Sequence, residues 1–202
     1  MTQPEDPKVV AMSDAVLAQR LLDGDETSFE ALFERHYSMV YGVLFRVVGN
    51  RGDAEDLAQE VFLKLLYRPP QHTENLAGWL YRVALNTAYN ALKAEQRRLR
   101  RERTVLPGPP ATSDPSYAEV VHRETRRQVQ RVLARMPRRA AQMLILREMG
   151  LSYREIANVV NVAPGSVGKL LDRARKTFLK HYDRIDGKVG PANEGERDAT
   201  SE

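Results

Sequence analysis

Residues 151–175 read LSYREIANVVNVAPGSVGKLLDRAR and carry the strongest local pattern in the chain. Ser152 and Glu155 match the S-x-x-E capping box, in which two side chains satisfy free amides at a helix start. After a turn at residues 161–163, Pro164 suits the first position of a second, basic helix. A short capped helix, a turn and a longer basic helix are the parts of a helix-turn-helix, which docks its second helix in the major groove of DNA.

The N-terminal end of that second helix is where side chains would reach DNA. Ser166 and Lys169 lie there, and the helix dipole favours phosphate at the same end. Further along, Arg173, Arg175 and Lys176 would hold the DNA backbone. An ordinary helical hairpin with a solvated basic face has the same pattern, so the spacing alone leaves both interpretations open.

Segments before this motif also show helical periodicity. Apolar residues predict helices over residues 13–22 and 29–47 and a third helix that Asp53 can cap. This third helix ends at Arg68-Pro69-Pro70, because proline disfavours helix at the residue before it. Closer to the motif, Pro137 breaks one helix, and a second helix ends where Gly150 can serve as a C-cap.

Residues 104–117, TVLPGPPATSDPSY, contain four prolines and no periodicity, which predicts an extended linker. We therefore expect an all-α protein with two small helical domains, residues 13–103 and 118–184. The first dozen residues and a polar tail, residues 185–202, are expected to be disordered.

Composition limits the functions open to this chain. It has 202 residues, is 42% hydrophobic and has no cysteine, which excludes disulfides, cysteine-ligated metals and thiol nucleophiles. No apolar run approaches the length of a membrane helix, and the N-terminus MTQPEDPKVV lacks the bases and apolar stretch of a secretion signal. We expect a cytoplasmic protein without membrane insertion.

Charge is distributed unevenly along the chain. Residues 53–60 carry four acids and no base, whereas residues 82–103 carry seven bases and two acids. Residues 122–139 carry seven arginines and one acid. This bipolar pattern favours two kinds of partner, a polyanion such as DNA and a protein.

The acidic segment DAEDLAQEVFLKLL invites a catalytic or metal-binding interpretation. Asp53, Asp56 and Glu60 recur about one helical turn apart, yet no third ligand type or nucleophile stands at a matched spacing. The four histidines are scattered, and the sequence has no P-loop, dinucleotide fingerprint or HExxH. We expect no catalytic residue, metal or cofactor. Taken alone, such an acidic run favours a solvated helix face.

The segment ENLAGWLYRVALNTAYNALKAEQRRLRRE predicts a helix from near Asn75 to about Arg103. Its aromatic residues alternate with bases and amides, a combination that suits unstacked single-stranded bases. Trp79 shares its spacing with Leu76 and Leu80, so a packing role comes first for this residue.

Taken in order, DAEDLAQEVFLKL, NLAGWLYRVALNTAYNALK, the Pro-rich linker and the helix-turn-helix with GLSYREIA resemble the extracytoplasmic-function sigma factors. These are the smallest members of the sigma-70 superfamily and keep only regions 2 and 4. The resemblance covers roughly residues 25–100 and 120–182. It implies a non-enzymatic factor that binds core RNA polymerase and directs initiation at −10 and −35 promoter elements. It also implies regulation by an anti-sigma factor.

The resemblance also implies residue roles. Binding to the polymerase clamp is expected from Asp53, Glu55, Asp56, Gln59, Glu60, Phe62 and Leu63. Recognition and opening of the −10 element is expected from Trp79, Arg82, Asn86, Asn90, Lys93 and Arg97. Recognition of the −35 element is expected from Tyr153, Ser166, Lys169, Arg173, Arg175 and Lys176. The linker is expected to thread through the polymerase.

Two departures from the family pattern stand out. Leu85 replaces an arginine that is frequent in the Trp-bearing helix. In the recognition helix, Gly168, Lys169 and Leu170 stand where lysine, serine and arginine are common. Contacts with the −35 element therefore cannot be carried over position by position.

Three other functions stay open on the sequence. The chain would be a helix-turn-helix transcriptional regulator if its N-terminal helical domain were a sensor and it bound duplex DNA without polymerase. A carboxylate enzyme lacks a convergent set of groups. The intact basic helix-turn-helix argues against a factor that only binds and inhibits polymerase.

Overall fold

The computed structural model describes residues 12–102 and 117–186, and every regular element in these ranges is a helix. The all-α fold class expected from the sequence is confirmed. The expected linker falls outside the described residues except for Tyr117, which is the first residue of a helix.

Four helices form the N-terminal unit: α2 (Asp14–Leu22), α3 (Thr27–Val48), α4 (Arg51–Tyr67) and α5 (Leu76–Glu102). Helix α3 packs against each of the other three. The buried core uses the apolar positions that recur at helical spacing, among them Leu32, Val40, Leu44, Val61, Leu65, Leu80 and Ala84. The unit is thus held by the faces that the sequence predicts.

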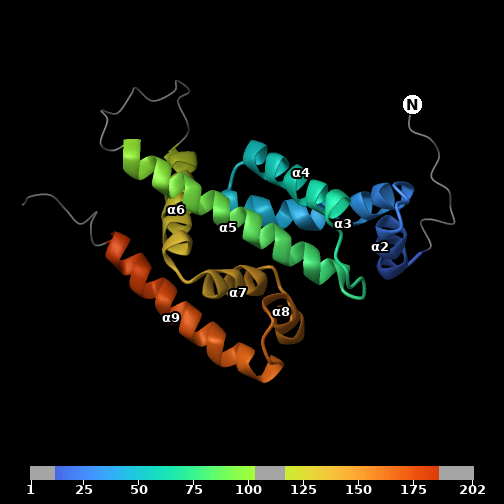
Figure 1. Ribbon diagram of the computed structural model, residues 1–202. Helices are drawn as coiled ribbons and strands as arrows, with labels where there is room; N and C mark the ends of the chain where they lie inside the picture. Colours follow the sequence, from blue (N-terminus) through green and yellow to red (C-terminus); the bar gives the residue numbers. More distant parts are fainter. Residues whose placement is uncertain (1–11, 103–116, 187–202) are drawn as a thin grey trace, which may run out of the picture.

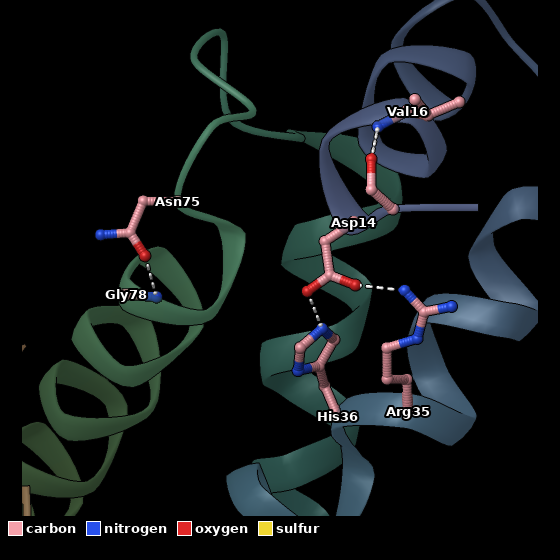
Figure 2. A network of polar contacts seen from close by, with 7 residues as sticks. Asp14, Val16, Arg35, His36, Asn75 and Gly78 are labelled. Atoms are coloured by element: carbon pink, nitrogen blue, oxygen red, sulfur yellow. Dashed lines mark hydrogen bonds and ion pairs between the residues drawn. The ribbon is translucent and has the colours of Figure 1, made fainter. Parts of the chain in front are cut away.

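Polar contacts fix the starts of α2 and α5 (Figure 2). Ser13 caps α2, as predicted, by accepting a hydrogen bond from the Val16 amide. Asp14 then ties α2 to α3, because its carboxylate contacts Arg35 and lies 2.7 Å from Nε2 of the buried His36. At the start of α5, the Asn75 side chain accepts a hydrogen bond from the Gly78 amide at 2.9 Å.

The start of α4 differs from the sequence prediction. Asn50, not Asp53, is the N-cap, and its side-chain oxygen accepts a hydrogen bond from the Asp53 amide at 2.8 Å. The predicted cap at Asp53 is wrong because Asn50, three residues earlier, suits an N-cap equally well. Asp53 instead lies in the first turn of α4, where its negative charge interacts favourably with the positive end of the helix dipole. The predicted stop is confirmed, since α4 ends at Tyr67 before Arg68.

The C-terminal unit contains α6 (Tyr117–Arg135), α7 (Arg138–Glu148), α8 (Tyr153–Val160), the 3-10 turn η1 (Pro164–Ser166) and α9 (Val167–Asp186). Pro137 separates α6 from α7 as predicted. Gly150 follows α7 with φ +87°, a left-handed conformation that glycine adopts without strain. Helix α9 packs against α6 and α7.

The two units lie in direct contact (Figure 1). Helix α5 crosses the molecule, with α3 and α4 on one side and α7 to α9 on the other, and α6 crosses it near its C-terminal end. It contacts α6 and α8 of the C-terminal unit as well as α3 and α4 of its own. One long helix therefore belongs to the N-terminal core and also faces the helix-turn-helix unit.

Candidate nucleic-acid interface

The helix-turn-helix begins at a complete capping box on α8. The Ser152 hydroxyl accepts a hydrogen bond from the Glu155 amide, and the Glu155 carboxylate accepts one from the Ser152 amide at 2.7 Å. The Ser152 hydroxyl also donates a hydrogen bond to the Glu155 carboxylate at 2.6 Å. This hydrogen bond, followed by the one from the Ser152 amide, holds the pKa of the Glu155 carboxyl below its ordinary value. The predicted capping box is confirmed, and it fixes the start of α8 relative to the preceding turn.

The turn between α8 and α9 needs one unusual backbone conformation. Asn161 has φ 54°, which asparagine tolerates better than most residues. Pro164 opens the next helical segment as predicted, but its first turn is the 3-10 turn η1, and the α-helix begins at Val167. Ser166 therefore stands at the junction of the two helical forms.

Helix α9 has one buried side and exposed residues on two other sides. Val167, Leu171 and Ala174 are buried. Because each residue advances about 100° around a helix, Ser166, Lys169, Arg173 and Lys176 share one exposed face. Arg175 is also exposed but lies on the opposite side from Arg173. Of the five predicted −35 contacts on η1 and α9, the structure thus brings four together and separates Arg175.

Tyr153 and Gly168 are neighbours between α8 and α9. The Tyr153 side chain is 48% exposed, and the Arg147 guanidinium lies 5.5 Å from the centre of its ring. A Cβ atom at Gly168 would lie 3.5 Å from Cε2 of Tyr153, an ordinary contact distance. Gly168 therefore faces the tyrosine ring of α8 and not the Lys169 face.

The acidic segment on α4 forms an exposed surface. Asp53, Asp56, Gln59 and Glu60 are exposed, and Glu55 is half-buried. Two of the acids carry ion pairs within the helix: Arg51 to Glu55 at 2.7 Å and Lys64 to Glu60 at 2.6 Å. Asp53 and Asp56, at the N-terminal end of α4, form no ion pair with a cation of their own helix.

The last two predicted polymerase contacts lie in different environments. Leu63 is 50% exposed, whereas Phe62 is 2% exposed and touches the rings of Phe29, Phe33 and Tyr37. A series of aromatic side chains, Phe29, Phe33, Tyr37, Tyr41 and Phe45, runs along α3 at a spacing of four residues. Its i, i+4 repeat is visible in the sequence, but helical periodicity alone marks these rings only as apolar positions.

Helix α5 carries the predicted −10 residues on several faces. Trp79 is half-buried and packs against the core, as its spacing predicts. Asn90 and Arg97 are exposed, and the Lys93 ammonium lies 5.5 Å from the centre of the Tyr89 ring. Leu85, the departure from the family pattern, is 1% exposed, so it takes part in packing and not in a DNA-facing surface.

Arg82 and Asn86 face the C-terminal unit. The Arg82 guanidinium donates hydrogen bonds to the carbonyls of Val159 and Asn158 at 3.0 and 3.2 Å. The Asn86 side-chain oxygen accepts a hydrogen bond from Gln142 of α7 at 2.7 Å. Neither partner is close in sequence, so no local pattern could have revealed these contacts.

Two other kinds of site find no support in the described parts of the chain. Residues 12–102 and 117–186 contain no group of three or more His, Asp or Glu side chains placed to hold a metal ion. Among the same residues, no helix is both long and apolar enough to cross a membrane.

Comparison with known proteins divides the chain in the same way as the fold. The family model for Sigma-70 region 2 matches residues 32–98, and the model for Sigma-70 region 4 matches residues 126–178. The first match covers α3 to α5, and the second runs from α6 into α9.

Relatives extend this similarity over most of the chain. The ECF RNA polymerase sigma-E factor of Escherichia coli K12 is 33% identical over 194 residues, covering 89% of this chain and 96% of the relative. The RNA polymerase sigma-H factor of Pseudomonas aeruginosa is 31% identical over 179 residues, covering 83% and 92%. In fold, the chain is similar to CnrH, solved in complex with the cytosolic domain of CnrY, with TM-score 0.52, 19% identity and coverage of 85% and 97%.

Proposed function

The chain belongs to the extracytoplasmic-function sigma factors of the sigma-70 family, and from this premise we propose which surfaces carry out each part of its function. As a sigma factor, it acts with core RNA polymerase to direct transcription initiation at promoters. The observation that carries this function is the order of the two family regions, each on its own helical unit. A regulator with an N-terminal sensor domain is not favoured, because the N-terminal unit is itself sigma region 2.

We propose that the exposed acidic surface of α4 binds the polymerase clamp. Asp53, Asp56 and Glu60 are exposed and project from one stretch of helix, and Leu63 adds exposed apolar area nearby. Charged pairs at a protein interface set both the encounter rate and much of the cost of disruption. Glu55 and Gln59 complete this surface. Phe62 supports it from the core, because its ring is buried.

We propose that the two DNA-reading surfaces are on α5 and α9. Arg82, Asn86, Asn90, Lys93 and Arg97 of α5 would contact the −10 element, with Trp79 supporting the helix from the core. Ser166, Lys169, Arg173 and Lys176 share the face of α9 that would enter the −35 major groove, with Tyr153 at its edge. Arg175 would contact backbone from the other flank of α9.

We also propose that the protein works in the cytoplasm by binding alone, without a cofactor and without catalysing a reaction. An anti-sigma factor is the proposed regulatory partner. The similarity in fold to CnrH, which was solved with the cytosolic domain of CnrY bound, supports the idea that this architecture accommodates a protein partner.

Transcription by core polymerase tests the function directly. Core enzyme supplied with this protein should start transcripts at discrete sites, and sequencing their 5′ ends identifies the promoters. Core enzyme without the protein should not start at those sites. Sequence-specific duplex binding combined with no effect on core enzyme would instead support the sensor-regulator alternative.

Charge reversal tests the polymerase-binding surface. Asp53→Lys, Asp56→Lys and Glu60→Lys together should weaken core binding by roughly 2–5 kcal/mol, the cost of disrupting one side of a charged interface. The matched control reverses three exposed acids elsewhere in the unit, Asp23, Glu26 and Glu30. Equal binding by both triple variants would show that the α4 acids form only a solvated face.

A further inference from the structure

One concentration of charge takes no part in the proposed surfaces. Residues 122–139 carry seven arginines, no lysine and one acid, and none of them belongs to the proposed contacts on α4, α5 or α9. Within α6, four of these arginines recur at every fourth position: Arg123, Arg127, Arg131 and Arg135. Residues at this spacing form a ridge along a helix, so we name the four the arginine ridge.

The arginine ridge lies on the outer side of α6. Arg123, Arg127 and Arg135 are exposed, and the Arg131 side chain is 33% exposed. Helix α6 packs against α5, α7 and α9. Because each residue advances about 100° around a helix, Arg123 and Arg127 lie on the side away from Val132, which is fully buried. The ridge is therefore directed to solvent and not to the helices that pack on α6.

Few acidic groups neutralise this ridge. Glu124 is the only acid in residues 122–139, and its carboxylate pairs with Arg131 at 2.5 Å. In the part of the chain that the structure describes, no carboxylate pairs with Arg123, Arg127 or Arg135. Like charges four residues apart on a helix repel each other and destabilise it. An anionic partner would remove this repulsion, so the charges of the ridge favour a bound state.

The spacing and the residue type favour the phosphates of DNA. Four residues of an α-helix rise about 6 Å, and each strand of a DNA duplex has a phosphate about every 3.4 Å along its axis. Successive guanidinium groups of the ridge can therefore reach roughly every second phosphate. Arginine also matches phosphate geometry better than lysine does, because its planar guanidinium presents a fork of donors.

A protein partner fits this surface less well. The centre of a protein interface is depleted of charged residues and rich in apolar ones. Val121, 44% exposed, is the one large apolar residue exposed on α6 among the side chains that the structure describes. It lies before the ridge begins, near the start of the helix. The ridge therefore lacks an apolar centre, and DNA backbone is the partner that its chemistry favours.

We propose that the arginine ridge is a third DNA-binding surface, which holds duplex backbone without reading its sequence. This role goes beyond the reading roles of α5 and α9, and it is independent of the −10 and −35 assignments. Two tasks are then separate within the C-terminal unit: α9 selects a sequence, and the ridge supplies affinity for any duplex. Phosphate contacts make such affinity strongly dependent on salt, so salt dependence is the property to measure.

Neutralising the ridge tests this role in the full-length protein. Arg123→Gln, Arg127→Gln and Arg135→Gln change exposed positions to a residue that favours helix nearly as well, so circular dichroism should show an unchanged helix content. Each phosphate contact contributes about 0.9 to the slope of log affinity against log salt. For a duplex without promoter elements, we therefore expect this slope to fall by about two to three units. Arg→Lys at the same three positions keeps the charges and should keep most of the slope.

The matched control removes three exposed arginines from the N-terminal unit, with Arg46→Gln, Arg51→Gln and Arg68→Gln. Both triple glutamine variants have the same net charge, so bulk charge alone would change their salt slopes equally. We expect the slope of the control to fall by less than about one unit. Equal slopes for the two variants would overturn the DNA-binding role of the ridge.

Two further results would also contradict a sequence-independent DNA surface. An unchanged slope combined with weaker binding to core polymerase would make the ridge a protein-binding surface. A changed −35 preference in selected sequences would show that the ridge takes part in reading. The sigma-factor function is tested separately, because failure of the parent protein to direct initiation with core enzyme would contradict that function and leave the duplex measurement valid.

Discussion

At the scale of single residues, Phe62 and Leu63 show how neighbours on one helix can have separate tasks. Phe62 is buried against three aromatic rings, whereas Leu63 is half exposed beside the acidic surface. We expect Phe62→Ala to lower the free energy of unfolding by about 3–5 kcal/mol, through lost burial and the cavity left behind. Leu63→Ala should change it by less than about 0.5 kcal/mol.

Urea unfolding and core-polymerase binding assays together test these separate roles of Phe62 and Leu63. Leu63→Ala should weaken polymerase binding although its stability is unchanged. If Leu63→Ala binds core as tightly as the parent, Leu63 lies outside the interface. If Phe62→Ala unfolds like the parent, the aromatic packing does not stabilise the unit.

Gly168 is a second residue whose environment decides its expected effect. An alanine Cβ there would lie 3.5 Å from the Tyr153 ring, which needs no displacement of a neighbour. Gly168→Ala should therefore raise the free energy of unfolding by about 0.5–1 kcal/mol, because alanine favours helix more than glycine does. Since this Cβ points toward α8, we expect −35 use to stay unchanged in transcription assays. Higher stability with lost −35 use would show that the glycine serves a close approach to DNA.

At the scale of elements, the capping box makes the start of α8 sensitive to acid. Hydrogen bonds from Ser152 lower the pKa of Glu155 in the folded protein relative to its ordinary value of 4.5. A lowered folded pKa stabilises the fold above the unfolded pKa, and this contribution disappears as pH falls through the folded value. Glu155→Gln should therefore be less stable than the parent at pH 7, with the difference shrinking below about pH 4.5.

Urea unfolding from pH 7 to pH 3 measures this prediction. Asp25 and Glu95 also have lowered pKa values, from hydrogen bonds with Thr27 and Arg98, but they titrate in both proteins and cancel in the difference. A difference that stays constant across this range would show that the ionised Glu155 does not contribute through its cap.

Helix α9 offers a comparison between base reading and backbone contact. Lys169→Ala should change the preferred −35 sequence, because a base-edge contact contributes about 1–3 kcal/mol of discrimination. Arg173→Ala should weaken all sequences alike and lower the salt slope by about one unit. Arg175→Ala, on the opposite side of α9, should lower that slope less.

Selection of −35 sequences and salt titration of duplex binding distinguish these three residues. An unchanged −35 preference for Lys169→Ala would mean that the Ser166–Lys169 face does not read bases. Equal salt slopes for Arg173→Ala and Arg175→Ala would mean that α9 does not dock through one face.

The sequence predicts individual helices well wherever a local physical signal exists. Ser13, Pro137 and the Ser152–Glu155 pair each act within one helical turn, and the structure confirms all of these predicted starts and breaks. The start of α4 was misplaced because Asn50 and Asp53 both suit a helix start, and only the hydrogen-bond geometry decides between them.

At the scale of the whole molecule, local signals no longer suffice. Arg82 finds its carbonyl partners 76 and 77 residues away, and Asn86 finds Gln142 56 residues away. Charge and spacing mark Arg82 as a DNA contact, but they carry no information about which helix end it meets. These contacts between the two units could therefore not be predicted from the sequence.

The chain's division into two units leads to the last prediction. Residues 104–117 contain four prolines and no apolar periodicity, whereas buried apolar residues hold each helical unit together. Exposed segments of such composition are preferred sites of proteolysis, so limited digestion should cut first between Thr104 and Tyr117. Mass spectrometry of the early fragments locates the cut, and circular dichroism of the separated fragments should show both to be helical.

The hydrogen bonds between the two units add a further expectation to this digestion. Cutting the linker turns an intramolecular contact into a bimolecular one and removes its effective concentration advantage. Arg126 and Gln130 of α6 donate hydrogen bonds to the carbonyls of residues 47–49, and these bonds form an anchor at the end of α3. The cut parent should therefore hold its two fragments together to lower protein concentrations on gel filtration than the cut Arg126→Ala and Gln130→Ala variant does. Early cleavage inside α2 to α5 or α6 to α9 would contradict the division into two units. Equal dissociation of the two cut proteins would leave the division intact and show that the anchor at the end of α3 does not hold the units together.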